Sequence, residues 1–324
     1  MKFSICLLLA KKQALLILIF ILNLSFIIYH SPKAYAQSAI SLGVDPPILQ
    51  INATAPALVR SKVVIINRGD SSVTLKVSFK PFIGSDREDG QIRYVNEELG
   101  VDVKLLDDSG EAINELELSP KEEKKLTLSI DIPRDSPPSD YYFSIIFLTG
   151  KSSKGETSSS SESITGIASN VLLSIGSDKV MGEIAQFSAP FFLEKGPVPF
   201  TVRIKNTSSH FINPKGEILI KNIFGQTIGR VDLAQVNILA NSVRNIPSEA
   251  YFNEGNLPDE IAAYWPQKFI LGPYKASLSI ALSDTGPLFK RSVFFFAFPI
   301  KGLVIATIGL LALIYITIRV RSKV

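Results

Sequence analysis

Hydrophobic and polar residues alternate with a period of two through most of the chain between residues 40 and 300. The clearest run, 73–80, places valine, leucine, valine and phenylalanine at odd positions and threonine, lysine, serine and lysine at even ones. Successive side chains of a strand point to opposite faces, so this pattern predicts a strand with one buried face. Similar runs predict strands at 40–51, 58–67, 101–106, 126–132, 140–149 and 164–175.

The alternation starts again in the second half of the chain, and it predicts strands at 200–205, 217–222, 227–233, 236–240, 274–282 and 292–298. Because no helix separates the strands in a βαβ rhythm, the chain is expected to be all-β, with two tandem immunoglobulin-like antiparallel β-sandwiches and one C-terminal transmembrane helix. Domain 1 is placed at 37–176 and domain 2 at 177–300. A faint repeat supports the tandem, since one strand in each half ends in an asparagine before a turn, at Asn67 and at Asn206.

The N-terminus has the pattern of a secretory signal peptide, which we place at 1–36. Lysines precede an apolar run, and the small residues Ala34 and Ala36 then stand before Gln37, which is the pattern of a cleavage site. An uncleaved membrane anchor stays open as the alternative, because the apolar run is nearly long enough to span a bilayer.

The C-terminus predicts a transmembrane helix at 301–318. The 17 residues of 302–318 carry no charge, and at 1.5 Å per residue they cover about 25 Å, which suffices to cross a bilayer with flanking residues. Arg319, Arg321 and a lysine follow the span, whereas Lys301 alone precedes it. The excess of cations after the span places the tail, 319–324, in the cytoplasm. A buried core helix is the alternative.

Charge and cysteine content narrow the function classes. Eight of the 34 basic residues lie in 1–36 and 301–324, which hold no acidic residue, so 37–300 has 26 basic against 30 acidic residues. This mildly acidic body has no clustered cations for nucleic acid, so no nucleic-acid partner is expected. The single cysteine, Cys6, lies within the signal, so disulfides and thiol chemistry are not expected after its removal.

No catalytic constellation is evident, and an enzyme is not expected. His210 is the only histidine outside 1–36, and it lies in a predicted loop, 206–210 (NTSSH), without a second histidine or a cysteine. Two acidic turns, 86–89 and 107–108, lack the alternate carboxylate spacing that calcium loops use. No metal, cofactor or catalytic residue is therefore assigned.

Two loops are candidates for partner contact. Arg68 and Asp70 flank a glycine in an adhesion-type tripeptide, with ordinary turn chemistry as the alternative. The serine-rich segment that contains Lys151 and Ser159 cannot bury apolar surface, and a solvated spacer is its alternative. The strand order of an immunoglobulin-like sandwich places both loops at the end of domain 1 that faces away from the membrane.

A second group of residues is expected at the membrane interface. The last strand runs almost directly into the transmembrane helix, so the segment before its hairpin partner should lie against the lipid. Tyr264 and Trp265 in this segment, together with Lys301, Arg319 and Arg321 around the helix, suit the interface. The alternative for Trp265 is a place in the core at the bottom of the sandwich. The direction of the strands relative to the membrane also predicts that His210 faces the joint between the two domains.

Three short turn motifs resemble those of the WxL-interacting surface proteins of Gram-positive bacteria: 89–94 (DGQIRY), 239–242 (LANS) and 272–274 (GPY). The resemblance implies a signal peptide, two immunoglobulin-like domains, one membrane helix and a basic tail. It further implies that the first domain meets cell-wall peptidoglycan and that the second meets a surface protein or a host ligand. More loosely, the chain is similar to the chaperone-type sandwiches of fimbrial assembly.

These patterns together predict a single-pass protein of a bacterial cell membrane, with its body outside the cytoplasm. Its expected function is non-catalytic adhesion, through binding of a cell-wall polymer or another surface protein. The alternative is a secretion or assembly chaperone that acts by strand addition, which predicts an open edge strand.

Overall fold

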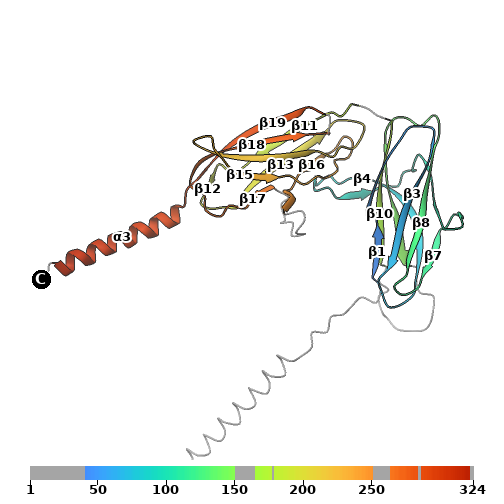
Figure 1. Ribbon diagram of the computed structural model, residues 1–324, viewed down its shortest axis with the longest axis horizontal. Helices are drawn as coiled ribbons and strands as arrows, with labels where there is room; N and C mark the ends of the chain where they lie inside the picture. The colour runs from blue at the N-terminus through green and yellow to red at the C-terminus, as the bar shows by residue number, and fades with distance from the viewer. Residues whose placement is uncertain (1–40, 150–164, 177–178, 251–262, 284–285, 322–324) are drawn as a thin grey trace, which may run out of the picture.

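The computed structural model describes residues 41–149, 165–176, 179–250, 263–283 and 286–321. They form two β-sandwiches and one C-terminal helix, which confirms the all-β class (Figure 1). The signal segment with Ala34, Ala36 and Gln37 lies outside the described residues, and so do Lys151 and Ser159.

The N-terminal sandwich spans residues 42–175 and contains two sheets of orders β1-β3-β8-β6 and β2-β10-β9-β4-β5, with β7 paired to β4. Its core is the inward face of each alternating run, and the buried side chains include Val63, Ile65, Leu75, Leu128 and Phe147, all fully buried. Each such side chain contributes about 1.5–3 kcal/mol by leaving water. The strands are β1 (Leu42–Asp45), β2 (Ile48–Ala53), β3 (Ala57–Asn67), β4 (Val73–Gly84), β5 (Ile92–Tyr94), β6 (Asp102–Leu106), β7 (Glu115–Leu118), β8 (Glu123–Ile132), β9 (Asp140–Thr149) and β10 (Gly166–Ile175).

The strand expected at 40–51 is in fact two strands in different sheets. β1 pairs antiparallel with β3, whereas β2 pairs parallel with β10. Pro46 and Pro47 separate them, and because proline lacks an N–H and fixes its φ angle, the ladder with β3 cannot continue through them. The chain therefore crosses to the opposite sheet, where β2 becomes its edge strand.

The C-terminal sandwich spans residues 182–297 and is built in the same way. One sheet has the order β11-β13-β16, with β17 paired to β13, and the other has the order β12-β19-β18-β14-β15. The segment 236–240, expected as a strand, forms only one bridge, between Ile212 and Ile238. The strands are β11 (Gly182–Ser188), β12 (Phe192–Leu193), β13 (Val198–Asn206), β14 (Lys215–Asn222), β15 (Thr227–Asp232), β16 (Val243–Asn245), β17 (Ala263–Trp265), β18 (Gly272–Ala281) and β19 (Leu288–Ala297).

Asn67 and Asn206 have equivalent structural roles in the two sandwiches. Each ends its strand, is buried, and places its Nδ2 within hydrogen-bond distance of three backbone carbonyls. The Oδ1 of each accepts a hydrogen bond, 2.9 Å long, from the backbone N–H two residues later. The faint sequence repeat therefore reflects a shared device, in which a buried amide satisfies the carbonyls of a neighbouring loop.

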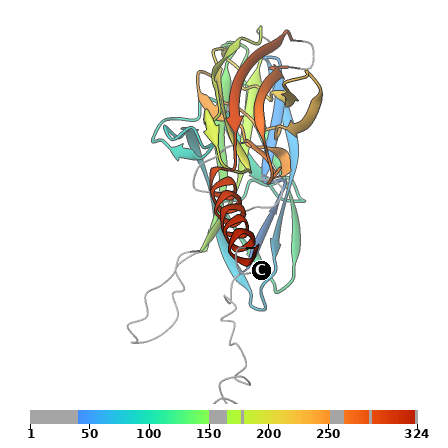
Figure 2. The same ribbon diagram turned by 90° about the vertical axis from the view of Figure 1, so that its left-hand side faces the viewer.

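The helix α3 (Ile300–Arg321) follows β19 after two residues and leaves the C-terminal sandwich at the end opposite the N-terminal sandwich (Figures 1 and 2). It is longer at both ends than the expected span of 301–318. Its length and apolar composition suffice to cross a membrane. In the N-terminal sandwich, Thr149 at the end of β9 pairs with Leu75 near the start of β4, so the turn between β3 and β4 lies at the end of this sandwich opposite the start of β9.

Candidate functional site

The two sandwiches meet around the carboxylate of Asp140, the first residue of β9. Its Oδ1 lies 2.7 Å from Nδ1 of His210, and its Oδ2 accepts hydrogen bonds of 2.5 Å from the backbone N–H of Phe211 and from the hydroxyl of Tyr142. The Asp140 side chain is only 1% exposed. Three donors compensate the loss of water around the carboxylate, which allows it to be buried in the joint.

Tyr142 extends this network across the joint. Its hydroxyl also accepts a hydrogen bond of 3.0 Å from the backbone N–H of Ala240 in the C-terminal sandwich. Burial, and then the negative charge of Asp140, raise the pKa of Tyr142 well above its ordinary value of 10.0. The phenol therefore stays protonated and remains a donor to Asp140. The ring of Phe82 stacks on that of Tyr142, with centroids 6.0 Å apart.

A second bridge comes from the hairpin of β4 and β5, which projects from the N-terminal sandwich toward the C-terminal one (Figure 1). At its tip, the Glu88 carbonyl accepts a 2.9 Å hydrogen bond from the N–H of Asn245, and the Glu88 carboxylate forms an ion pair with Arg203. Gly90, with a φ of 80°, lies against the guanidinium of Arg244, where a Cβ atom would be 2.1 Å from Nη2. The close approach of the hairpin therefore needs glycine at this position.

A cavity of about 310 Å³ lies between the two bridges. Its floor is the outer face of β2, β10 and β4, and its roof is the segment 235–244 together with Asn213. Apolar side chains such as Leu172 and Leu239 alternate on these walls with uncharged amides, which are Gln50, Gln91, Asn170, Asn213, Gln235 and Asn237. Amides both donate and accept hydrogen bonds, so these walls match neutral polar groups such as peptide bonds or hydroxyls. We call this cavity the inter-sandwich cleft.

Two buried polar atoms of the cleft residues are not satisfied within the described part of the chain: Nε of Arg244 and Oδ1 of Asn213. Arg244 is fixed by a 2.5 Å hydrogen bond from Nη1 to the carbonyl of Asn237. Burial lowers the pKa of Arg244, while the charge of Asp89 opposes this effect. Unsatisfied buried groups are uncommon in native proteins, and a water molecule or a group of a bound ligand can supply the missing hydrogen bond.

The free edge of β2 borders the cleft. The N–H of Asn170 donates to the carbonyl of Pro47, and the N–H of Gly176 donates to the carbonyl of Ala53, at the two ends of the β2–β10 pair. Backbone groups alternate in direction along a strand, so the odd-numbered residues of β2 face β10. The N–H and C=O groups of Ile48, Gln50 and Asn52 therefore point to the opposite edge, which no strand among the described residues covers. The sequence predicted a strand here but not its position at an edge.

Comparisons with known proteins return only structural neighbours, since no family model and no curated protein matches the chain. A class 5 fimbriae chaperone, CfaA, has a TM-score of 0.38 and 12% identity over 80% of this chain and 100% of its own. The E. coli chaperone DraB has a TM-score of 0.37 and 11% identity, over 78% and 98% of the two chains. A match from the Salmonella enterica SafA pilin–SafB chaperone complex has a TM-score of 0.37 and 7% identity, over 80% and 99%. The assignment of the fold rests on the strand order of this chain itself.

Two of the three motifs behind the resemblance meet at the cleft. The segments 89–94 and 239–242 are far apart in the sequence, yet Gly90, Gln91, Leu239 and Ser242 all line the same cavity. The third motif, 272–274, lies at the α3 end of the C-terminal sandwich. The resemblance to WxL-interacting proteins itself stays a prediction.

The candidate partner contacts of the first loop lie far from the cleft. Arg68 and Asp70 are exposed, and Lys121 holds both through Nζ, which lies 2.7 Å from the Arg68 carbonyl and 2.7 Å from Oδ1 of Asp70. Their role in partner binding stays a prediction, as does that of Lys151 and Ser159.

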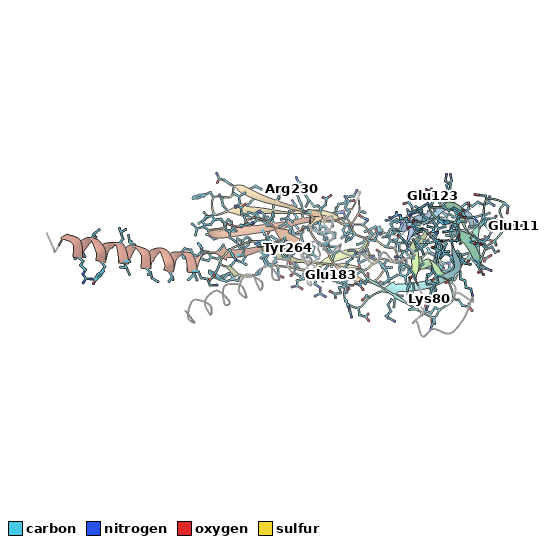
Figure 3. The ribbon with its side chains drawn as sticks, turned by 90° about the horizontal axis from the view of Figure 1, so that it is seen from below. Lys80, Glu111, Glu123, Glu183, Arg230 and Tyr264 are labelled. Atoms are coloured by element: carbon cyan, nitrogen blue, oxygen red, sulfur yellow. The ribbon has the colours of Figure 1, made fainter. Side chains whose placement is uncertain are left out.

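Trp265 is buried in the C-terminal sandwich, so its expected place at the membrane interface is wrong. It is 6% exposed and packs edge-on against Tyr274, with ring centroids 5.9 Å apart. The alternative of a core position holds, because β17 pairs with β13 and turns this side chain into the sandwich. Tyr264 on the same strand is half-buried and lies nearer to α3 than Glu183 does (Figure 3).

The cations around α3 differ in their surroundings. Lys301 is 84% exposed and forms an ion pair of 3.1 Å with Glu194. Arg319 is exposed near the end of α3, and Arg321 is its last residue. Their place at a membrane interface stays a prediction.

The residues that join the sandwiches were missed in the sequence, with the exception of His210. Arg203 lies at a polar position of an alternating run and Glu88 lies in an acidic turn, whereas Asp140 and Tyr142 begin a predicted strand without an assigned face. Their place in the joint depends on how the two sandwiches meet, which hydrophobic periodicity does not encode.

Proposed function

We propose that this protein is a membrane-anchored, non-catalytic envelope protein that holds an extended segment of a partner polypeptide by strand addition to the free edge of β2. The observation that carries the proposal is the outward direction of the backbone groups of Ile48, Gln50 and Asn52 beside the inter-sandwich cleft. This is the function of the chaperone alternative rather than that of the adhesin.

The chemistry of the edge suits a polypeptide. An added strand gains backbone hydrogen bonds to β2, each worth about 0.5–1.5 kcal/mol net, and every second side chain of that strand faces the cleft. Ile48 is 48% exposed and offers apolar contact, whereas Gln50 and Asn170 offer amides. Specificity then comes from the cleft and affinity from the backbone.

The two bridges preorganise this site. The Asp140 network and the Glu88–Arg203 ion pair fix the sandwiches on either side of the cleft, so binding need not order them. A site that is already ordered loses less conformational entropy when it binds its ligand.

We further propose that α3 crosses the cell membrane, with the sandwiches outside and Arg319 and Arg321 in the cytoplasm. Support comes from the apolar length of the helix and from the cations that follow it. The signal peptide at 1–36 is part of the same proposal, because export delivers the sandwiches to the outer side.

A second candidate is a cell-wall polymer as the ligand, in keeping with the resemblance to WxL-interacting proteins. The amide-rich walls favour it, because amides also bind the hydroxyl groups of glycans. The two candidates differ in their need for the backbone of β2, which only a polypeptide strand uses.

Site-specific photo-crosslinking of the full-length chain in its native envelope tests the proposal. With benzoylphenylalanine at Asn52, we expect crosslinks that map to one short extended segment of a partner protein, and no such crosslinks from Glu123 on the other sheet (Figure 3). Gln50→Pro removes the outward N–H and should abolish the crosslink, whereas Gln50→Ala keeps that N–H and should retain it. Binding of purified wall that is equal in the proline and alanine variants, without a protein crosslink, would favour the polymer instead.

A further inference from the structure

The end of the C-terminal sandwich nearest α3 is unusually apolar at its surface. Register places this end at the start of β18 and the end of β19, where Gly272 pairs with Ala297, immediately before α3. The five most exposed large hydrophobic side chains of the described residues all lie in strands or turns at this end. They are Phe224 (83% exposed), Phe191 (77%), Ile223 (70%), Phe269 (67%) and Phe294 (66%).

The turn between β14 and β15 combines internal backbone hydrogen bonds with an apolar tip, and both features suit a lipid interface. The Asn222 Oδ1 accepts hydrogen bonds of 3.0 Å from the N–H groups of Phe224 and Gln226, and the N–H of Gly225 donates to the Asn222 carbonyl. The backbone of the turn is thus largely satisfied internally, which is the condition for entering an apolar phase. The side chains at its tip, Ile223 and Phe224, are apolar and point outward.

Two lysines lie directly beside this tip on the outer face of the sheet. Lys221 on β14 and Lys275 on β18 are cross-strand neighbours. Like charges in this position repel, and within the described chain neither lysine has a carboxylate within ion-pair distance. An anion between them removes this repulsion.

A groove of about 420 Å³ joins the two features. It is lined by Lys221, Lys275, Ile223, Pro273 and Phe294, and Nζ of Lys275 lies 5.6 Å from the centre of the Phe294 ring. Cations beside apolar side chains match the boundary of a bilayer, where phosphate groups lie above acyl chains.

From these observations we infer that the α3-proximal end of the C-terminal sandwich docks on an anionic phospholipid surface. Ile223, Phe224 and Phe269 enter the interface, and Lys221 and Lys275 hold a headgroup phosphate. The inference rests on the membrane anchoring by α3 in the proposed function. It adds a second contact with the lipid, which restricts the orientation of the C-terminal sandwich relative to the membrane. The place expected for Trp265 is thereby taken by side chains on neighbouring turns.

Spin labelling of the full chain in vesicles tests this inference. Single cysteines replace Phe224, Leu288 and Leu311 in a Cys6→Ser background, and accessibility to oxygen and to a water-soluble nickel chelate gives the depth of each label. Leu288 is a matched control, since it is 56% exposed at the opposite end of β19. In vesicles with one part phosphatidylglycerol to three parts phosphatidylcholine, we expect the label at 224 inside the interface and that at 288 in water.

The label at 311 separates the two proposals. A lipid-exposed label at 311 with an aqueous label at 224 would overturn the docking while leaving the anchoring intact. An aqueous label at 311 would overturn the anchoring itself. The double substitution Lys221→Glu and Lys275→Glu should move the label at 224 into water without changing that at 311, and an unchanged depth at 224 would refute the role of the lysines.

Discussion

Nδ1 of His210 lies 2.7 Å from Oδ1 of Asp140, and this contact joins the two sandwiches through residues that are 70 positions apart in the sequence. Ser174 places its hydroxyl 2.7 Å from the same nitrogen, so the N-terminal sandwich surrounds this edge of the imidazole. The only histidine outside the signal segment is therefore part of the joint that shapes the inter-sandwich cleft.

Asp140→Ala should destabilise the protein by about 3–5 kcal/mol, because it leaves the Phe211 N–H, the Tyr142 hydroxyl and the imidazole without their buried acceptor. The free energy of unfolding from urea titration of the full chain in detergent measures this. Asp102→Ala is the control, since Asp102 and Lys104 form an exposed pair whose removal should leave the free energy of unfolding almost unchanged. Equal losses in the two variants would contradict the role of Asp140.

Stability should fall above about pH 10, and part of the fall should disappear in Tyr142→Phe. The folded pKa of Tyr142 is raised above the ordinary 10.0 of the unfolded phenol, so at higher pH the unfolded chain releases a proton that the folded chain retains. The unfolding free energy then decreases by up to about 1.4 kcal/mol per pH unit from this group. Urea titrations from pH 8 to 11 measure the slope, with Tyr94→Phe as the control because Tyr94 is 39% exposed. A slope that is identical in wild type and Tyr142→Phe would contradict the burial of this phenol.

Trp265 is the single tryptophan, so its fluorescence reports one site. Its 6% exposure predicts blue-shifted emission and weak quenching by acrylamide in detergent. Because the ring lies in the core, the emission maximum should stay the same when the chain is moved from micelles to vesicles. A red-shifted maximum in micelles that moves to the blue in vesicles would return Trp265 to the membrane interface.

Asn67→Ala and Asn206→Ala should each lower the free energy of unfolding by several kcal/mol. Each substitution removes the amide donor of several backbone carbonyls. The cost of one unsatisfied buried group is about 1–3 kcal/mol. Thermal unfolding of both variants, with exposed Asn96→Ala as the control, tests the equivalence. A large loss in one variant and none in the other would show that the two asparagines differ in role.

Much of the fold follows from periodicity in the sequence. The run 73–80 and the strands 126–132 and 274–282 read correctly, because each has one buried and one solvent-facing side. Very short strands such as β12 and β17 were missed, since two or three residues carry no period. The break of the first strand at Pro46 was visible in the sequence, but the alternation on both sides of it concealed the change of sheet.

The candidate site was less accessible to sequence reasoning. The sequence does not distinguish a buried aspartate from an exposed one. Asp140 is buried because β9 begins where the C-terminal sandwich contacts the N-terminal one. The edge position of β2 depends on a long-range parallel pairing with β10, which no local pattern reports. Besides His210, which was expected at the joint, the turn motifs at 89–94 and 239–242 were an available signal, and their meeting at a cleft required the structure.

Hydrogen exchange along β2 tests the strand-addition account most directly. In the free full-length protein, the amides of Gln50 and Asn52 should exchange rapidly, whereas those of Leu49 and Ile51, which face β10, should be protected. On addition of a synthetic peptide with the sequence of the crosslinked segment, Gln50 and Asn52 should gain at least tenfold protection. Saturating peptide that leaves the exchange of both amides unchanged would contradict the account.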